Sequence, residues 1–149
     1  MLCSRSTANT DYLLAYTNFT YADLTVDSTA ASGAATGPIV PGGAEDLFEE
    51  VATVTASITN SGDVTGAEVA QLYLAFPASA EQPVRQLRGF SKLPLEAGAS
   101  GTATFALRKR DLAVWNTQEQ VWTVPAGEFG VQVGASSRDI RLEGTITVA

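Results

Sequence analysis

The sequence predicts an all-β fold, arranged as a two-sheet antiparallel β-sandwich. About seven short segments alternate apolar and polar residues and are separated by turns rich in Gly, Pro, Asn and Asp. The chain has 13 glycines and only 17% charged residues, a composition that favours frequent turns over long helices. Its 149 residues are enough for one domain with its own hydrophobic core.

The clearest strands lie within residues 52–76. Val54, Ala56 and Ile58 alternate with Thr and Ser, so one face of this strand points to a core and the other to water. Residues 60–63, Asn-Ser-Gly-Asp, have the composition of a tight turn. The next strand, residues 67–76, is apolar on both faces, which predicts a position inside a sandwich or beneath another domain.

The N-terminal third is less regular. Residues 1–11 are polar without periodicity and are predicted to be disordered, so the domain is expected to span 12–149. Residues 12–26 predict the first strand, with Phe19, Tyr21 and Leu24 as its apolar contacts. Residues from about 27 to 46 are rich in Ser, Thr, Ala and Gly, and predict a long flexible loop.

The remaining chain continues the strand-and-turn pattern. Alternation predicts strands at residues 84–93, 101–107, 128–133 and 141–148. A short helical turn is expected at 110–112. It is followed by a hairpin in which 114–115 and 121–124 are the strands.

The charge and cysteine content exclude several functions. A net charge of −7 argues against nucleic acid and anionic membrane surfaces as partners, and no apolar stretch approaches the roughly 20 residues of a membrane span. The chain has one cysteine and no histidine, so it lacks an internal disulfide, a familiar serine triad and the usual zinc ligand sets. We therefore expect no cofactor and no metal.

Catalysis by carboxylates is the remaining chemical possibility, because a glycosidase needs two of them beside a cleft. Asp111 with Glu119, or Glu68 with Glu128, cannot be paired from sequence, and solvated strand ends explain all four residues. We expect no catalytic residue in this chain.

Several motifs in order resemble one family. They are Asn60-Ser-Gly-Asp-Val-Thr-Gly-Ala-Glu-Val-Ala-Gln-Leu-Tyr-Leu74, Gln86-Leu-Arg-Gly-Phe-Ser-Lys-Leu93, Arg110-Asp-Leu-Ala-Val-Trp115, Val124-Pro-Ala-Gly-Glu128 and Val133-Gly-Ala-Ser-Ser-Arg-Asp-Ile140. Together they resemble the fibronectin type III-like domain that closes many family 3 glycoside hydrolases, chiefly fungal-type β-glucosidases. The similarity covers roughly residues 50–149 and weakens toward 13–19, as expected for a fragment or an orphan of such an enzyme.

The resemblance implies an immunoglobulin/fibronectin type III-like sandwich that is not catalytic itself. It implies an accessory role, in which the domain packs against and stabilises the catalytic domains and helps to place polysaccharide. Two other readings stay open. The chain could be a free-standing carbohydrate-binding or adhesive module, or a structural interaction module.

Six residues are predicted to dock on those catalytic domains. Phe90, with Arg85 and Arg88, gives one strand the mixed aromatic and arginine face favoured at interfaces, and Tyr73 adds a second apolar face. Arg138 and Asp139 form either an interdomain hydrogen-bonding pair or a local loop clamp.

Two tryptophans and one asparagine complete the candidate sites. Trp115 and Trp122 on the expected hairpin suit core or interdomain packing better than a sugar-stacking platform. Asn18-Phe-Thr20 is an N-glycosylation sequon. No signal peptide is recognisable at the start of the chain, whereas the resemblance implies an extracellular, secreted parent enzyme.

Overall fold

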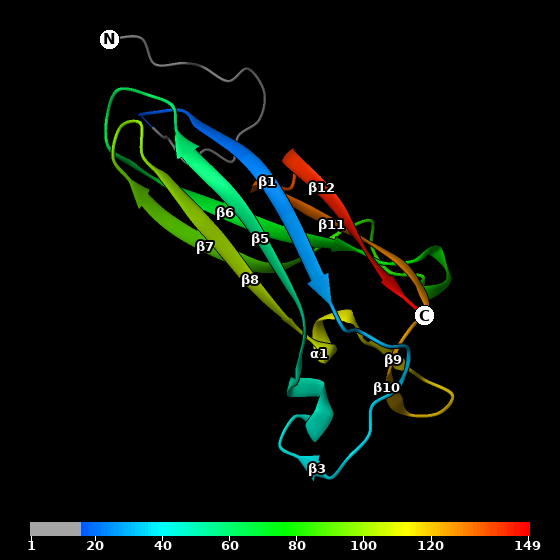
Figure 1. The fold of residues 1–149 in the computed structure, drawn as a ribbon. Helices are drawn as coiled ribbons and strands as arrows, with labels where there is room; N and C mark the ends of the chain where they lie inside the picture. The colour runs from blue at the N-terminus through cyan, green and yellow to red at the C-terminus, as the bar shows by residue number, and fades with distance from the viewer. Residues whose placement is uncertain (1–15) are drawn as a thin grey trace.

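The computed structural model describes residues 16–149. Two antiparallel sheets pack face to face (Figure 1). One has the order β1-β5-β8, formed by Phe19–Ser28, Glu50–Asn60 and Ser100–Arg108. The other has the order β12-β11-β6-β7, formed by Asp139–Val148, Gly127–Ser136, Gly66–Ala75 and Gln86–Leu95. These seven strands confirm the predicted β-sandwich.

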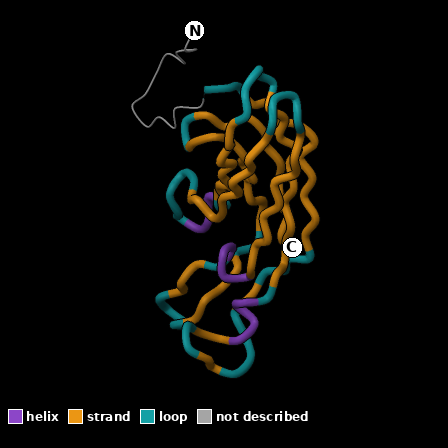
Figure 2. Tube along the Cα trace, turned by 90° about the vertical axis from the view of Figure 1, so that its left-hand side faces the viewer, coloured by secondary structure: helices purple, strands orange, loops and turns teal. Residues whose placement is uncertain are grey.

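A smaller lobe lies at one end of the sandwich (Figure 2). It contains a sheet of order β2-β10-β9, formed by Gly33–Ala34, Val121–Val124 and Val114–Asn116, and the pair β3 (Ile39–Val40) and β4 (Gly43–Ala44). The short helix α1 (Lys109–Leu112) and the 3-10 turn η1 (Glu45–Phe48) complete the lobe, and a second 3-10 turn, η2, spans Ala78–Ala80. No helix in the described part of the chain is long and apolar enough to cross a membrane.

The core lies between the two main sheets. Alternate residues of each strand point inward, as the period of two requires. From β1-β5-β8 come Val54, Ile58, Phe105 and Leu107, and from the other sheet come Leu72, Leu74, Phe129, Val131, Val133 and Ile146, all 4% exposed or less. Phe19 is also buried, and Tyr21 and Leu24 pack partly buried against this core, as predicted.

The predicted turn at 60–63 joins two strands that lie in different sheets. β5 pairs with β1 and β8, whereas β6 pairs with β7 and β11, so the turn crosses from one layer to the other. Asn60 is fully buried there. Its side chain accepts hydrogen bonds from the Thr17 hydroxyl and the Gly62 N–H, and donates to the carbonyls of Val64 and Leu95. The buried amide thus ties the 60–64 turn to Thr17 and to the end of β7 at this end of the sandwich.

The predicted flexible loop at about 27–46 is irregular but connected to the body. The Thr36 N–H and hydroxyl donate to Asp46 Oδ2 at 2.9 and 3.0 Å, and Lys109 Nζ lies 2.6 Å from the same oxygen. Burial alone would raise the pKa of Asp46, but the hydrogen bonds from Lys109 and Thr36 outweigh it and lower that pKa. The Ala35 N–H also donates to the Trp122 carbonyl at 2.7 Å. Composition does not reveal these partners, so the short strands β2, β3 and β4 were not expected.

The other boundaries differ only locally from those expected. The first strand begins at Phe19, and the part of its predicted range before residue 16 lies outside the described residues, as does the predicted disordered segment 1–11. The helical turn forms as α1, and β9 pairs with β10 in the predicted hairpin.

Candidate docking surface

Strand β7 carries the exposed apolar residues that the sequence associates with docking. Phe90 is 72% exposed and Leu87 is 51% exposed, and Val84, just before the strand, is 82% exposed. We call these three residues the β7 strip. β7 is an edge strand, because only β6 pairs with it. The strip therefore lies where a partner can reach both its side chains and its free strand edge.

A bulge in β7 brings Leu87 and Phe90 onto the same face. Leu72 pairs with Gly89 and Tyr73 pairs with Leu87, so Arg88 is an extra residue on the β7 side. Strict alternation would place Leu87 and Phe90, three residues apart, on opposite faces. Sequence reasoning therefore missed Leu87, and the extra residue that moves it is visible only in the strand pairing.

The same bulge directs Arg88 into the domain. Its Nε donates to the Asp111 carbonyl at 2.9 Å, one of its terminal nitrogens donates to Gln86 Oε1 at 2.7 Å, and its guanidinium lies 5.6 Å from the centre of the Phe76 ring. Arg85 also has an internal partner, since its Nη1 donates to the Ser137 carbonyl at 2.6 Å. Both arginines thus help to hold the shape of the sheet around the strip.

Tyr73 lies beside the strip but presents little surface. It is only 8% exposed, with Leu87 on one neighbouring strand and Gln132 on the other, and its hydroxyl donates to Gln71. Its ring supports Leu87 from the side.

Asp139 pairs with Arg141 instead of the adjacent Arg138. Arg141 Nε and Nη2 donate to the two carboxylate oxygens at 3.1 and 2.8 Å, and these bonds lower the pKa of Asp139. The Arg141 guanidinium also stacks 4.8 Å from the centre of the Tyr21 ring and donates to the Phe19 carbonyl. Asp139 is thus held by Arg141 within its own strand, and Arg138 is exposed on the turn.

The tryptophan hairpin forms with the two rings in contact. Trp115 and Trp122 are direct cross-strand neighbours, with ring centres 5.6 Å apart and planes at 69°. Trp122 is half-buried against the core and lies under the Arg110 guanidinium, whereas Trp115 is 48% exposed. Because the rings meet edge to face, they do not form one flat platform. Of the two rings, Trp115 offers the larger surface to solvent.

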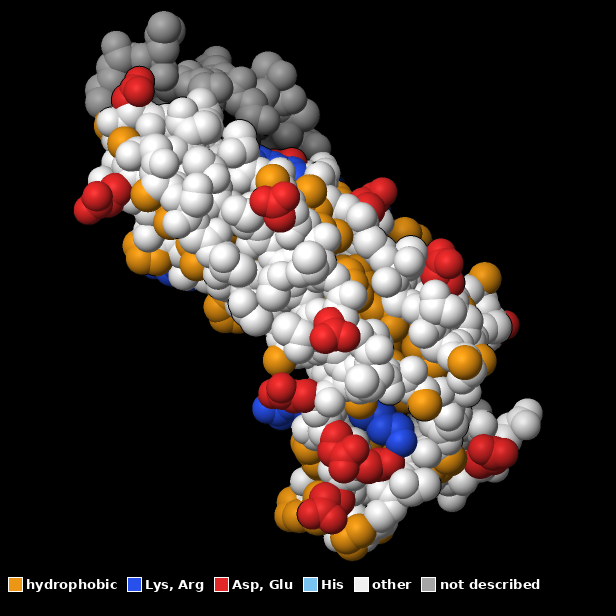
Figure 3. Space-filling view, in the orientation of Figure 1, with side chains coloured by type: hydrophobic (Ala, Val, Ile, Leu, Met, Phe, Trp, Pro, Cys, Tyr) orange, Lys and Arg blue, Asp and Glu red, His pale blue; other side chains and the backbone are white. Residues whose placement is uncertain are grey.

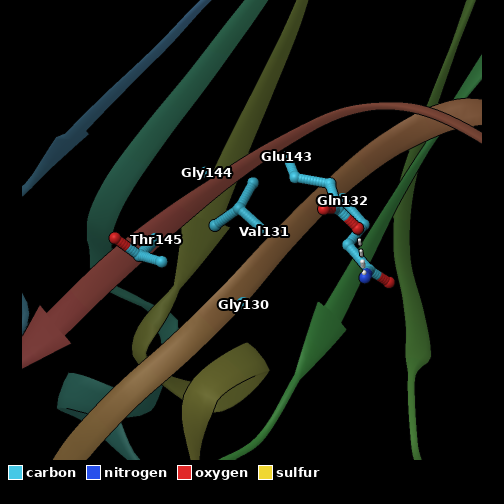
Figure 4. A pocket seen from close by; sticks show the side chains of 6 residues that line it. All are labelled: Gly130, Val131, Gln132, Glu143, Gly144 and Thr145. Atoms are coloured by element: carbon cyan, nitrogen blue, oxygen red, sulfur yellow. Dashed lines mark hydrogen bonds between the residues drawn. The ribbon is translucent and has the colours of Figure 1, made fainter.

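A hollow of about 280 Å³ lies against β11 and β12 (Figure 4). Gly130, Val131, Gln132, Glu143, Gly144 and Thr145 line it, and Gln132 Nε2 donates to Glu143 Oε1 at 3.0 Å. It has a single carboxylate, whereas glycoside hydrolysis uses two.

Three of the four carboxylates considered from sequence accept hydrogen bonds within the domain, and the fourth, Glu128, is exposed on β11. Asp111 accepts from the Arg108 N–H, Glu119 accepts from the Asn116 amide, and Glu68 accepts from Tyr21. Within residues 16–149 there is no cluster of three or more acidic or cysteine side chains that could hold a metal ion.

Comparison with known proteins finds relatives that are named as β-glucosidases. Residues 68–137 match the family described as Fibronectin type III-like domain. The chain is 62% identical over 140 residues to "Beta-glucosidase cel3A" of Pyricularia oryzae, covering 92% of this chain and 19% of that protein. It is 54% identical to "Probable beta-glucosidase L" of Aspergillus terreus, covering 91% and 18%. The chain thus spans about a fifth of the length of these relatives.

Solved structures agree with this assignment. The β-D-glucoside glucohydrolase from Trichoderma reesei superposes with a TM-score of 0.88 at 62% identity, over 90% of this chain and 19% of that one. A family 3 (GH3) β-glucosidase from Bifidobacterium adolescentis superposes with a TM-score of 0.70 at 37% identity, over 89% and 17%. This chain therefore belongs to the fibronectin type III-like domains of family 3 β-glucosidases.

Proposed function

We propose that the chain is a non-catalytic accessory domain of a β-glucosidase, and that it packs against the catalytic domains and stabilises them. The parent enzyme would hydrolyse terminal β-D-glucosyl residues and would be extracellular. Support comes from the relatives, which are named as β-glucosidases and of which this chain matches about a fifth. The remaining four-fifths is where the catalytic machinery would lie.

The observation that carries the docking role is the β7 strip. A free domain gains nothing from leaving Phe90 and Leu87 largely exposed side by side on an edge strand. Burying each such side chain contributes about 1.5–3 kcal/mol, so a partner that covers both gains appreciable binding energy. The exposed Arg138 can add a polar contact at the rim of the same interface.

The test uses the Trichoderma reesei relative from which the region matching this chain has been deleted. We expect the 149-residue chain to bind this truncated enzyme in calorimetric titration and to raise its unfolding temperature. Phe90→Asp should weaken binding at least tenfold. Thr104→Asp, an equally polar change at an exposed position on β8, should leave binding unchanged. Failure of the chain to bind, or equal effects of the two variants, would refute docking through the strip.

The exposed ring of Trp115 supports a second candidate function, binding of a β-glucan chain. One exposed indole can stack on a sugar ring, although a lone ring offers less contact than a platform. In affinity electrophoresis, soluble β-glucan should then slow the migration of the wild-type chain. Trp115→Ala should abolish this retardation, while docking to the truncated enzyme persists. If wild-type migration is unaffected by β-glucan, this second function is excluded.

A further inference from the structure

We propose that Asn18 is an N-glycosylation site, and that its glycan lies on the side of the sandwich opposite the β7 strip. The first observation is the sequon Asn18-Phe19-Thr20 at the start of β1. Asn18 and Thr20 are both exposed, whereas Phe19 between them is 8% exposed and points into the core. The two polar side chains of the sequon are thus on the solvent side of an extended segment.

The backbone at Asn18 is fixed while its side chain is not engaged. The Ser61 N–H donates to the Asn18 carbonyl at 2.8 Å and the Ser61 hydroxyl donates to the same oxygen at 3.2 Å. No hydrogen bond within residues 16–149 involves the Asn18 amide group. A glycan on its Nδ2 would therefore break none of the described contacts.

The surface next to the sequon is suited to a sugar chain. The outer side of the sheet β1-β5-β8 carries nine hydroxyl side chains, which we call the hydroxyl face: Thr20, Thr25, Thr53, Thr55, Ser57, Thr59, Ser100, Thr102 and Thr104. Thr20 pairs with Thr59, and Thr59 in turn pairs with Ser100, so one row of hydroxyls starts at the sequon itself. The space-filling view shows mainly neutral polar surface with few charges over this part of the molecule (Figure 3).

The position of the glycan separates two sides of the domain. β1 belongs to one main sheet and β7 to the other, so a glycan at Asn18 would leave Leu87 and Phe90 accessible. A bulky hydrated glycan cannot be buried in a protein interface. The hydroxyl face near Asn18 would accordingly face solvent in the parent enzyme, and docking would use the other sheet.

The modification needs an oligosaccharide donor linked to a lipid through pyrophosphate, as supplied by a eukaryotic secretory pathway. The Asn18 Nδ2 attacks the anomeric carbon of the first sugar. A C–N bond forms, the bond between that carbon and the phosphate oxygen breaks, the lipid pyrophosphate leaves, and the nitrogen gives up one proton. The reaction involves no net oxidation or reduction. This step rests on the extracellular location proposed above.

The experiment secretes the full chain, fused to a signal sequence, from a glycosylating eukaryotic host. The intact mass should show one N-glycan, which an amidase that releases N-glycans from asparagine removes. Both Asn18→Gln and Thr20→Ala should abolish this glycan. Asn116→Gln is the matched control, because Asn116-Thr-Gln is not a sequon, and should leave the glycan in place. Unglycosylated secreted protein, or a glycan that survives Asn18→Gln, would overturn the site.

A second acceptor tests the side assignment. Lys92→Asn combined with Pro94→Thr introduces a sequon at exposed positions of β7. The protein glycosylated at Asn18 should bind the truncated enzyme within about twofold of the deglycosylated protein, and the protein glycosylated on β7 should lose binding. Loss of binding through the Asn18 glycan would overturn the side assignment. Docking itself is tested separately with unglycosylated protein, so the two failures are distinguishable.

Discussion

The hydroxyl of Tyr21 on β1 donates a hydrogen bond of 2.6 Å to the carboxylate of Glu68 on β6, and this bond joins the two main sheets. Glu68 is only 8% exposed, so its carboxylate depends on this contact and on the nearby positive charge of Arg141. An acidic group at this depth is costly unless it is paired. The pair therefore contributes stability and also fixes how β1 lies over the opposite sheet.

Removing the hydroxyl should show this contribution. We expect Tyr21→Phe to lower the free energy of unfolding by about 1–3 kcal/mol, because a buried acceptor loses its donor. Tyr73→Phe is the matched control, since that hydroxyl bonds Gln71 within one strand and serves no carboxylate. Urea denaturation monitored by tryptophan fluorescence measures both. Equal losses in the two variants would show that the Glu68 contact has no special weight.

The same pair predicts a loss of stability at alkaline pH. Burial and the hydrogen bond and negative charge of Glu68 raise the pKa of Tyr21 well above its usual value. The folded protein then keeps the proton that the unfolded chain releases, so the stabilisation is complete below about pH 10 and declines as pH rises above it. Between pH 8 and 11, the wild type should lose more stability than Tyr21→Phe. Parallel pH profiles would contradict the prediction.

The buried amide of Asn60 should be a third determinant of stability. Asn60→Ala would leave four polar groups without their partner, and we expect a loss of about 2–4 kcal/mol. Asn116→Ala is the control, because Asn116 serves only the local turn at 116–119 and should cost about 1 kcal/mol or less. Thermal denaturation distinguishes the two, and a smaller loss at Asn60 would contradict its role.

Much of the sandwich could be predicted from sequence because its strands alternate cleanly. Val54, Ala56 and Ile58 identify the inward face of β5 without reference to any other strand. Alternation does not reveal which strands pair, so the placement of β5 and β6 in different sheets was not foreseen. The contact between Tyr21 and Glu68 joins residues 47 positions apart and has no local signal at all.

The candidate site was predictable only in part for the same reason. The aromatic and arginine residues of this strand predict an exposed face, and Phe90 is exposed there. Because of the bulge at Arg88, the residue beside Phe90 on that face is Leu87, and Arg88 points into the domain. Tyr73 is covered because Leu87 and Gln132 flank it from neighbouring strands. Strand pairing and bulges decide which side chains meet, and neither is encoded in a single strand. The docking role of these residues stays a prediction.

The β7 strip should also govern self-association of the isolated chain. Exposed apolar side chains on a free strand edge favour pairing between molecules. We expect sedimentation velocity to show reversible association at high concentration, which Leu87→Asp or Phe90→Asp reduces without changing the unfolding temperature. Thr104→Asp should not affect it, because that residue lies on the hydroxyl face. A wild type that is fully monomeric at millimolar concentration would contradict this.

The two tryptophans should separate stability from sugar binding. Trp122 packs partly buried against the core and under Arg110, so Trp122→Ala should lower stability by about 2–4 kcal/mol, somewhat less than for a fully buried ring. Trp115 is half-exposed, so Trp115→Ala should cost about 1 kcal/mol, chiefly from the lost edge-to-face contact. Chemical denaturation followed by far-ultraviolet circular dichroism measures both variants, because neither result then depends on the fluorescence of the residue removed.

Trp115→Phe is the control for both roles, because it keeps an aromatic face at the same exposed position. It should retain most of the contact with Trp122 and therefore most of the stability. If Trp115 stacks on sugar, Trp115→Phe should retain weak binding to β-glucan and Trp115→Ala should abolish it. If Trp115 instead belongs to an interdomain contact, neither variant should change the binding of β-glucan, and both variants should dock more weakly to the truncated enzyme. A Trp115→Ala variant as unstable as Trp122→Ala would contradict both roles and make the pair a purely structural element of the lobe.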